Sequence, residues 1–92
     1  MTGTGGSAFD SQASYRVGEQ VVLRRESFGA LAYDLHSKAL RVLRDPDLVS
    51  VLEQLDGATS ASEAVTAAPV EKRKTMLAAL ARLEREGMIR VV

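Results

Sequence analysis

The stretch ALRVLRDPDLVSVLEQLDG, residues 39–57, passes from a strand pattern to a helix pattern. Residues 39–44 alternate in side-chain direction, as a short strand does, with Leu40 and Val42 on one side and Arg41 and Leu43 on the other. A helix over 37–44 is the alternative, because Ala, Leu and Arg are good helix formers. Asp45 is a favoured N-cap, and Pro46 suits the first helical position. Apolar residues then recur at three- and four-residue spacing, at Leu48, Val51, Leu52 and Leu55. The stretch therefore predicts a strand over 39–44 followed by a helix that ends at Gly57.

The chain before this stretch has strand character. Residues 21–23 are β-branched or apolar, and a polar turn follows them. Residues 28–36 alternate, which predicts two faces of a strand: Leu31, Tyr33 and Leu35 on one, and Ala30, Ala32 and Asp34 on the other. Together with the strand at 39–44, these runs predict that residues 15–44 form a three-stranded antiparallel β-meander.

A second, short helix is predicted after the first. Ser60 or Ser62 is placed to cap it, because a serine hydroxyl can accept from the free N–H groups of the first turn. The helix is expected to run through Ala67. Pro69 stops it, since proline cannot continue a helix.

A third and longer helix is predicted over residues 70–86, with Gly87 as its C-terminal stop. Its apolar stripe is expected in the core and comprises Met76, Leu77, Leu80 and Leu83. Residues 88–92 predict a short strand or wing. The predicted fold class is α+β, winged helix-turn-helix-like, with an N-terminal three-stranded antiparallel β-meander followed by three α-helices.

The length of 92 residues allows one domain with one modest core. Residues 1–14 are rich in Gly, Ser and Thr, which predicts a disordered N-terminal tail before a domain over 15–92. No apolar run approaches the roughly 18 residues that a membrane helix needs. We expect a cytoplasmic protein with no membrane partner.

The composition argues against an enzyme. The chain has no cysteine, which excludes disulfides, thiolate metal sites and cysteine nucleophiles. His36 is the single histidine, so a site with two histidine ligands is excluded as well. Four acidic residues, Asp45, Asp47, Asp56 and Glu63, fall at predicted helix ends, where capping accounts for them. We therefore expect no catalytic group, no metal and no cofactor.

The net charge of zero conceals a strong segregation along the chain. Residues 15–44 carry six basic and three acidic side chains, and residues 70–92 carry the same numbers. Residues 45–69 between them carry five acidic side chains and no basic one. Such patterning creates local fields even when the total charge vanishes.

One functional hypothesis is nucleic-acid binding by a winged helix. Lys72, Arg73 and Lys74 begin the third predicted helix and would enter the major groove first. The zero net charge argues against this hypothesis, because DNA-binding domains are usually basic. We expect no nucleic-acid partner.

A second hypothesis is peptide binding at the strand 39–44. If that strand lies at a sheet edge, its unpaired backbone groups can accept an extended peptide as an added strand. A helix beside the edge would complete a groove with basic side chains, from Lys38, Arg41, Arg44, Lys72, Arg73 and Arg82, over an apolar floor of Leu43, Met76 and Leu80. The same edge could instead join two copies in a homodimer.

Residues 15–92 resemble the PqqD-like domains, the recognition elements of pathways for ribosomally made, post-translationally modified peptides. The resemblance follows the predicted strands, then Leu55-Asp56-Gly57, then Ser62-Glu63-Ala64-Val65, then the helix end LEREGMI at 83–89. A sharper match is RESFGALAY, residues 25–33, which resembles the peptide chaperones of mycofactocin systems.

This resemblance implies a non-enzymatic chaperone that binds the leader of a precursor peptide by strand addition. It also implies that the chaperone presents the precursor to a radical S-adenosylmethionine (radical SAM) enzyme and holds no cofactor itself. The implied peptide-binding residues lie on or beside the strand 39–44 and on the helix 70–86. They are Lys38, Leu40, Arg41, Val42, Leu43, Arg44, Arg73, Met76, Leu77 and Leu80.

Overall fold

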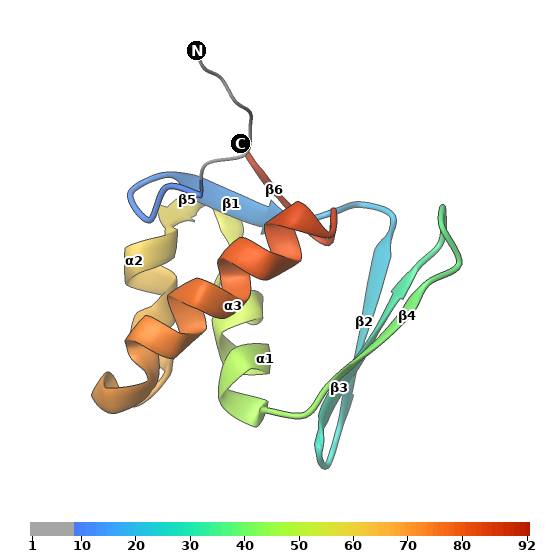
Figure 1. Ribbon diagram of the computed structural model, residues 1–92, viewed down its shortest axis with the longest axis horizontal. Helices are drawn as coiled ribbons and strands as arrows, with labels where there is room; N and C mark the ends of the chain where they lie inside the picture. The colour runs from blue at the N-terminus through green and yellow to red at the C-terminus, as the bar shows by residue number, and fades with distance from the viewer. Residues whose placement is uncertain (1–8) are drawn as a thin grey trace.

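The computed structural model describes residues 9–92, which form two three-stranded antiparallel sheets and three α-helices (Figure 1). The fold is therefore α+β, as predicted. In chain order the elements are β1 Ser14–Val17, β2 Val21–Glu26, β3 Gly29–Asp34, β4 Leu40–Leu43, α1 Pro46–Glu53, β5 Asp56–Ser60, α2 Ala61–Ala64, α3 Arg73–Arg85 and β6 Ile89–Val91. Two 3-10 turns, Val65–Ala67 and Val70–Lys72, lie between α2 and α3.

The predicted meander is present as the sheet β2-β3-β4, which begins at Val21 rather than at residue 15. The predicted alternation of β3 is confirmed, because Ala30, Ala32 and Asp34 are buried while Leu31 and Tyr33 are half-buried on the other face. The small alanines allow α1 to pack closely against the inner face of this sheet.

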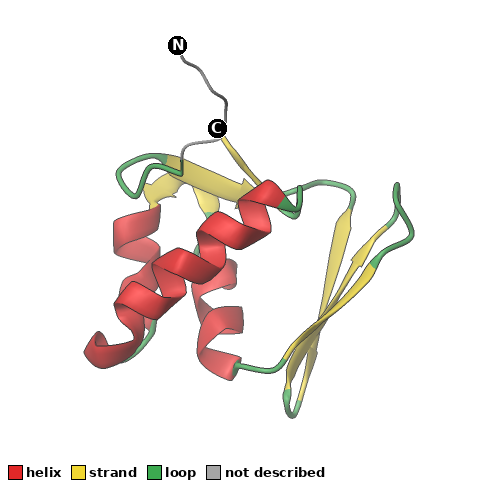
Figure 2. Cartoon of the chain, in the orientation of Figure 1, coloured by secondary structure: helices red, strands yellow, loops and turns green. Residues whose placement is uncertain are grey.

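The second sheet, with strand order β5-β1-β6, was not predicted. Residues 14–17 leave the expected meander, and their strand pairs with β5 on one side and β6 on the other. Figure 2 shows this sheet above the helices, while the β2-β3-β4 hairpins lie to the right of them. The predicted order of three strands followed by three helices is therefore wrong, since β5 separates α1 from α2.

Gly57 does not end the first helix, which corrects the predicted boundary. α1 ends at Glu53, and Gly57 takes its left-handed φ of 85° inside β5. The carboxylate of Asp56 accepts the N–H groups of Ala58 and Thr59 at 2.8 Å each. This local turn starts β5 instead of capping a helix.

α2 ends at Ala64 rather than at Ala67, and α3 begins at Arg73 rather than at residue 70, because two 3-10 turns occupy the residues between them. Three of the predicted capping signals are nevertheless present. The Asp45 carboxylate accepts the Asp47 N–H at 2.9 Å, so Asp45 is the N-cap of α1. The Ser60 hydroxyl accepts the Glu63 N–H and caps α2. Gly87, with a φ of 81°, follows α3 as predicted.

The core lies between the three helices and the inner faces of both sheets. Its largest fully buried side chains are Tyr15, Val49, Val51 and Leu80. Most of the predicted tail, residues 1–8, lies outside the described residues. Within the described part, the Phe9 ring stacks on Tyr15 with centroids 4.9 Å apart. Among residues 9–92 no helix is long and apolar enough to cross a membrane.

Candidate functional site: the groove between β4 and α3

The candidate site begins at the free edge of β4. β4 is the last strand of its sheet and pairs only with β3 in the part of the chain that is described. The edge of β4 that does not pair with β3 lies beside α3, and two adjoining hollows run between β4 and α3. We call this surface the β4–α3 groove.

Backbone geometry determines which groups of β4 are available at this edge. The Asp34 N–H donates to the Ala39 carbonyl at 2.9 Å, which makes these residues a hydrogen-bonded pair. Because such pairs alternate along antiparallel strands, Arg41 and Leu43 bond to β3. The N–H and C=O groups of Leu40 and Val42 therefore point to the free edge.

The side chains of β4 divide between the two faces of the sheet. Arg41 is the partner of Ala32 and Leu43 is the partner of Ala30, so both face the helices. Leu40 and Val42 point the other way and are 56% and 46% exposed. Only Leu43, at 8% exposed, is buried in the core.

The hollow beside Leu43 is mainly apolar. It has a volume of about 290 Å³. Its apolar wall includes Leu43, Leu48, Met76 and Ala79, while the more polar rim is formed by Arg44, Asp45, Thr75 and Arg82. The start of α1 closes this end of the groove, because Asp45 and Leu48 belong to that turn.

The hollow beside Arg41 is more polar. It has a volume of about 320 Å³ and is lined by Leu40, Arg41, Val42, Leu43, Arg82, Leu83 and Glu86. The Arg41 Nε lies 3.5 Å from Glu86 Oε1, so an ion pair connects β4 to the end of α3. Arg82 borders both hollows and forms no ion pair with any described residue. This hollow therefore carries two arginines and one glutamate.

The groove contains part of the predicted binding set. The residues that line it are Leu40, Arg41, Val42, Leu43, Arg44 and Met76. Leu80 is fully buried in the core, and Leu77 packs against the core from a half-buried position. Lys38 is exposed in the turn before β4, with a φ of 65°. These three residues do not line the two hollows, and their contact with a peptide stays a prediction.

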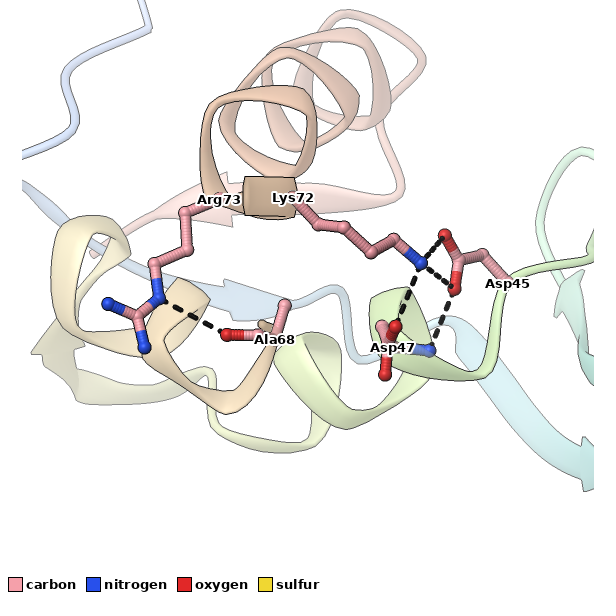
Figure 3. A network of polar contacts seen from close by, with 5 residues as sticks. All are labelled: Asp45, Asp47, Ala68, Lys72 and Arg73. Carbon is pink, nitrogen blue, oxygen red and sulfur yellow. Dashed lines mark hydrogen bonds and ion pairs between the residues drawn. The ribbon is translucent and has the colours of Figure 1, made fainter. Parts of the chain in front are cut away.

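Lys72 and Arg73 also lie outside the groove, because each is engaged elsewhere (Figure 3). Lys72 Nζ lies 2.8 Å from Asp45 Oδ2 and 2.8 Å from Asp47 Oδ2. The Arg73 Nε donates to the Ala68 carbonyl at 3.1 Å. The predicted cluster of Lys72 and Arg73 with the basic residues of β4 is therefore not formed.

The Lys72 contacts shift the ionisation of both partners. Hydrogen bonds to Asp45 and Asp47 raise the pKa of Lys72 above its usual value. The Lys72 ammonium, followed by the Asp47 N–H, lowers the pKa of Asp45. This contact explains how a lysine is tolerated before α3, where its charge opposes the helix dipole.

Thr75, Ala79 and Glu86 line the groove and were not among the predicted residues. Thr75 and Ala79 share one face of α3 with Met76 and Arg82 at helical spacing, and Glu86 follows as the C-cap residue of the helix. Helical periodicity would have grouped them, but only the position of β4 shows that this face is the open one. No cluster of three His, Cys, Asp or Glu side chains within residues 9–92 has the arrangement of a metal site.

A small α+β domain with an open strand edge beside a lined groove has the properties of a binding module. Comparison with known proteins agrees: the model of the peptide chaperone MftB family matches residues 14–90, and the chain belongs to this family. It is 34% identical over 83 residues to the peptide chaperone MftB of Mycolicibacterium smegmatis, covering 88% of this chain and 81% of that protein. No solved structure matches the chain. The protein is thus a peptide chaperone and not an enzyme.

Proposed function

We propose that this chaperone binds the leader of a ribosomally made precursor peptide as a fourth strand beside β4, and presents the precursor to a radical SAM maturase in a mycofactocin-type pathway. The observation that supports strand addition most directly is the free edge of β4. There the backbone groups of Leu40 and Val42 point outward, beside a groove lined by α3. Family membership supports a peptide as the ligand.

Presentation follows from the geometry of such a complex. A leader held as a strand leaves the rest of the precursor free to reach a second protein. Holding one end of the precursor raises its effective concentration at an enzyme that binds the chaperone. The chaperone needs no metal or cofactor for this role.

The test is titration of the ¹⁵N-labelled chaperone with a synthetic acidic leader peptide, followed by NMR and calorimetry. The Leu40 and Val42 amides should gain protection from hydrogen exchange, because they acquire bonding partners. The Arg41 and Leu43 amides already bond to β3 and should change less. If calorimetry detects heat release but hydrogen exchange of the β4 amides does not change, strand addition is contradicted.

A proline substitution tests the contribution of the free β4 edge without removing the hydrogen bonds that hold the fold together. Val42→Pro removes one outward N–H, while the β3–β4 bonds of Arg41 and Leu43 remain available. We expect it to weaken leader binding about tenfold. Val42→Thr keeps both the N–H and the β-branched shape and should bind like the original chain.

The same pair of variants tests presentation. With a limiting amount of chaperone, Val42→Pro should slow modification of the precursor by the maturase, and Val42→Thr should not. A DNA duplex is the control ligand for the winged-helix hypothesis. Micromolar DNA binding with a steep salt dependence would overturn the peptide assignment.

A further inference from the structure

The chemistry of the β4–α3 groove also limits which peptide fits, and this inference depends on the proposed strand addition. A peptide strand beside β4 would direct alternate side chains into the groove and the others to the opposite face. The inward positions are those beside Arg41 and Leu43, since both side chains face α3. Two inward side chains of the peptide are therefore two residues apart, or about 7 Å.

The position beside Leu43 is suited to an apolar side chain. Met76 and Ala79 in its wall are only 2% and 7% exposed, so they belong to the core as well as to the groove. An apolar peptide side chain placed here would cover apolar surface that water now contacts. A charged side chain seated against Met76 and Ala79 would lose hydration, because the charged groups of this hollow, Arg44, Asp45 and Arg82, lie at its rim.

The position beside Arg41 is suited to a carboxylate. Arg41 already has Glu86 as a partner at 3.5 Å, but Arg82 forms no ion pair within the described part of the chain. Lys72, which could have added positive charge, is neutralised by Asp45 and Asp47. The uncompensated charge of this hollow is therefore positive and comes from the arginine pair.

We infer that the groove selects an extended peptide in which an apolar side chain and an acidic side chain are separated by one residue. Leu43, Met76 and Ala79 receive the apolar side chain, and Arg41 and Arg82 receive the carboxylate. The intervening residue points to the face that carries Leu40 and Val42 and is not selected by the groove. The order of the two side chains reports whether the peptide runs parallel or antiparallel to β4.

The experiment is selection from a randomised peptide library displayed on phage, with the full chaperone as bait. The original chain should enrich sequences that carry an apolar and an acidic residue two positions apart. The double variant Arg41→Glu/Arg82→Glu should enrich a basic residue at the acidic position and keep the apolar one. Lys74→Glu changes the same charge at an exposed position of α3 outside the groove and should leave the motif unchanged.

One selected peptide then allows a quantitative check. Replacing its acidic residue by the matching amide should raise the Kd of the original chain about 5- to 10-fold. The same replacement should change the Kd of the single variant Arg82→Ala less than twofold. Arg82 is exposed, so this variant serves if the double variant does not fold.

The outcomes distinguish the inference from the function on which it rests. Peptides that bind along β4 without this spacing would overturn the inference and leave strand addition intact. Enrichment of a basic residue by the original chain would overturn it too. If no selected peptide affects the β4 amides, both the inference and the proposed strand addition fail.

Discussion

Asp45 acts at the point where β4 becomes α1. Its carboxylate accepts the Asp47 N–H and also pairs with Lys72 from the turn before α3. The first contact starts a helix, and the second connects segments 27 residues apart in sequence. One side chain therefore fixes both the end of the edge strand and the position of α3 beside it.

Two substitutions at this residue separate the cap from the charge. Asp45→Ala removes both, and we expect it to lower the free energy of unfolding by about 1–2 kcal/mol. Asp45→Asn keeps a good N-cap and loses only the charge, so it should cost less. Urea denaturation at pH 7 measures both costs. Equal costs would mean that the charge, and not the cap, accounts for the stability contributed by Asp45.

At the scale of elements, the β3–β4 pairing depends on Gly29. Its φ of 144° is a conformation that other residues rarely adopt. A Cβ built there would lie 1.9 Å from the Leu43 carbonyl oxygen. Leu43 is the last residue of β4. The absence of a side chain at Gly29 therefore allows the Leu43 backbone to approach β3 closely, which holds β4 in register.

Gly29→Ala should therefore destabilise the fold by about 2 kcal/mol or more and also weaken leader binding, because β4 must shift. Gly87→Ala is the matched control. It has a left-handed φ of 81° but no atom within 4 Å of the added Cβ. We expect it to cost about 1 kcal/mol and to leave binding unchanged. Thermal unfolding and calorimetry measure the two effects, and unchanged binding by a folded Gly29→Ala chain would contradict the link between them.

The elements differ in how far the sequence predicts them. Asp45, Ser60 and Gly87 are local signals, and the helix boundaries that depend on them are confirmed. β1, β5 and β6 have three to five residues each, and their pairing involves distant segments, so no local pattern shows it. Asp56-Gly57 is also ambiguous, since the same dipeptide can end a helix or start a turn.

The sequence predicts the β4 side of the candidate site but not the α3 side. The alternation of residues 39–44 correctly separated Leu40 and Val42 from Arg41 and Leu43. On α3, periodicity identified an apolar stripe, but one part of it, including Leu80, is enclosed by the core. The open face of the helix is set by the position of β4, which depends on tertiary packing.

At the scale of the whole molecule, the segregated charges of the chain meet in space. Arg25 of β2 pairs with Glu53 of α1 at 2.8 Å, and Lys72 pairs with the two aspartates at the start of the same helix. The acidic segment 45–69 is thus partly neutralised by both basic segments. Arg41, Arg44 and Arg82 remain at the groove, where Glu86 pairs with Arg41.

The pH dependence of stability should be controlled by three aspartates. Backbone N–H groups of Ser37 and Ala58 lower the pKa of Asp34 and Asp56, and Lys72 lowers the pKa of Asp45. A group with a lowered pKa stabilises the fold fully above its usual value of 3.8, and this contribution is lost as the pH falls through the folded value. Stability should therefore be steady near neutral pH and decline below about pH 4.

Urea titrations followed by circular dichroism between pH 2 and pH 7 measure this decline. The variant with Asn at all three positions lacks these three titrating carboxylates, so its stability should depend less on pH in the acid range. A decline of the same steepness in both chains would assign acid sensitivity to other carboxylates.

The position of β1 between β5 and β6 has a consequence for synthesis in the cell. β1 is made first, yet one of its two neighbours is built from residues 89–91. Until those residues leave the ribosome, one edge of β1 has no strand to pair with, and Tyr15 lacks its partner Val91. The β2-β3-β4 hairpins join neighbouring segments and can form much earlier. The groove strand should thus be in place before the rest of the domain closes, and the nascent chain should expose its N-terminal strand for longest.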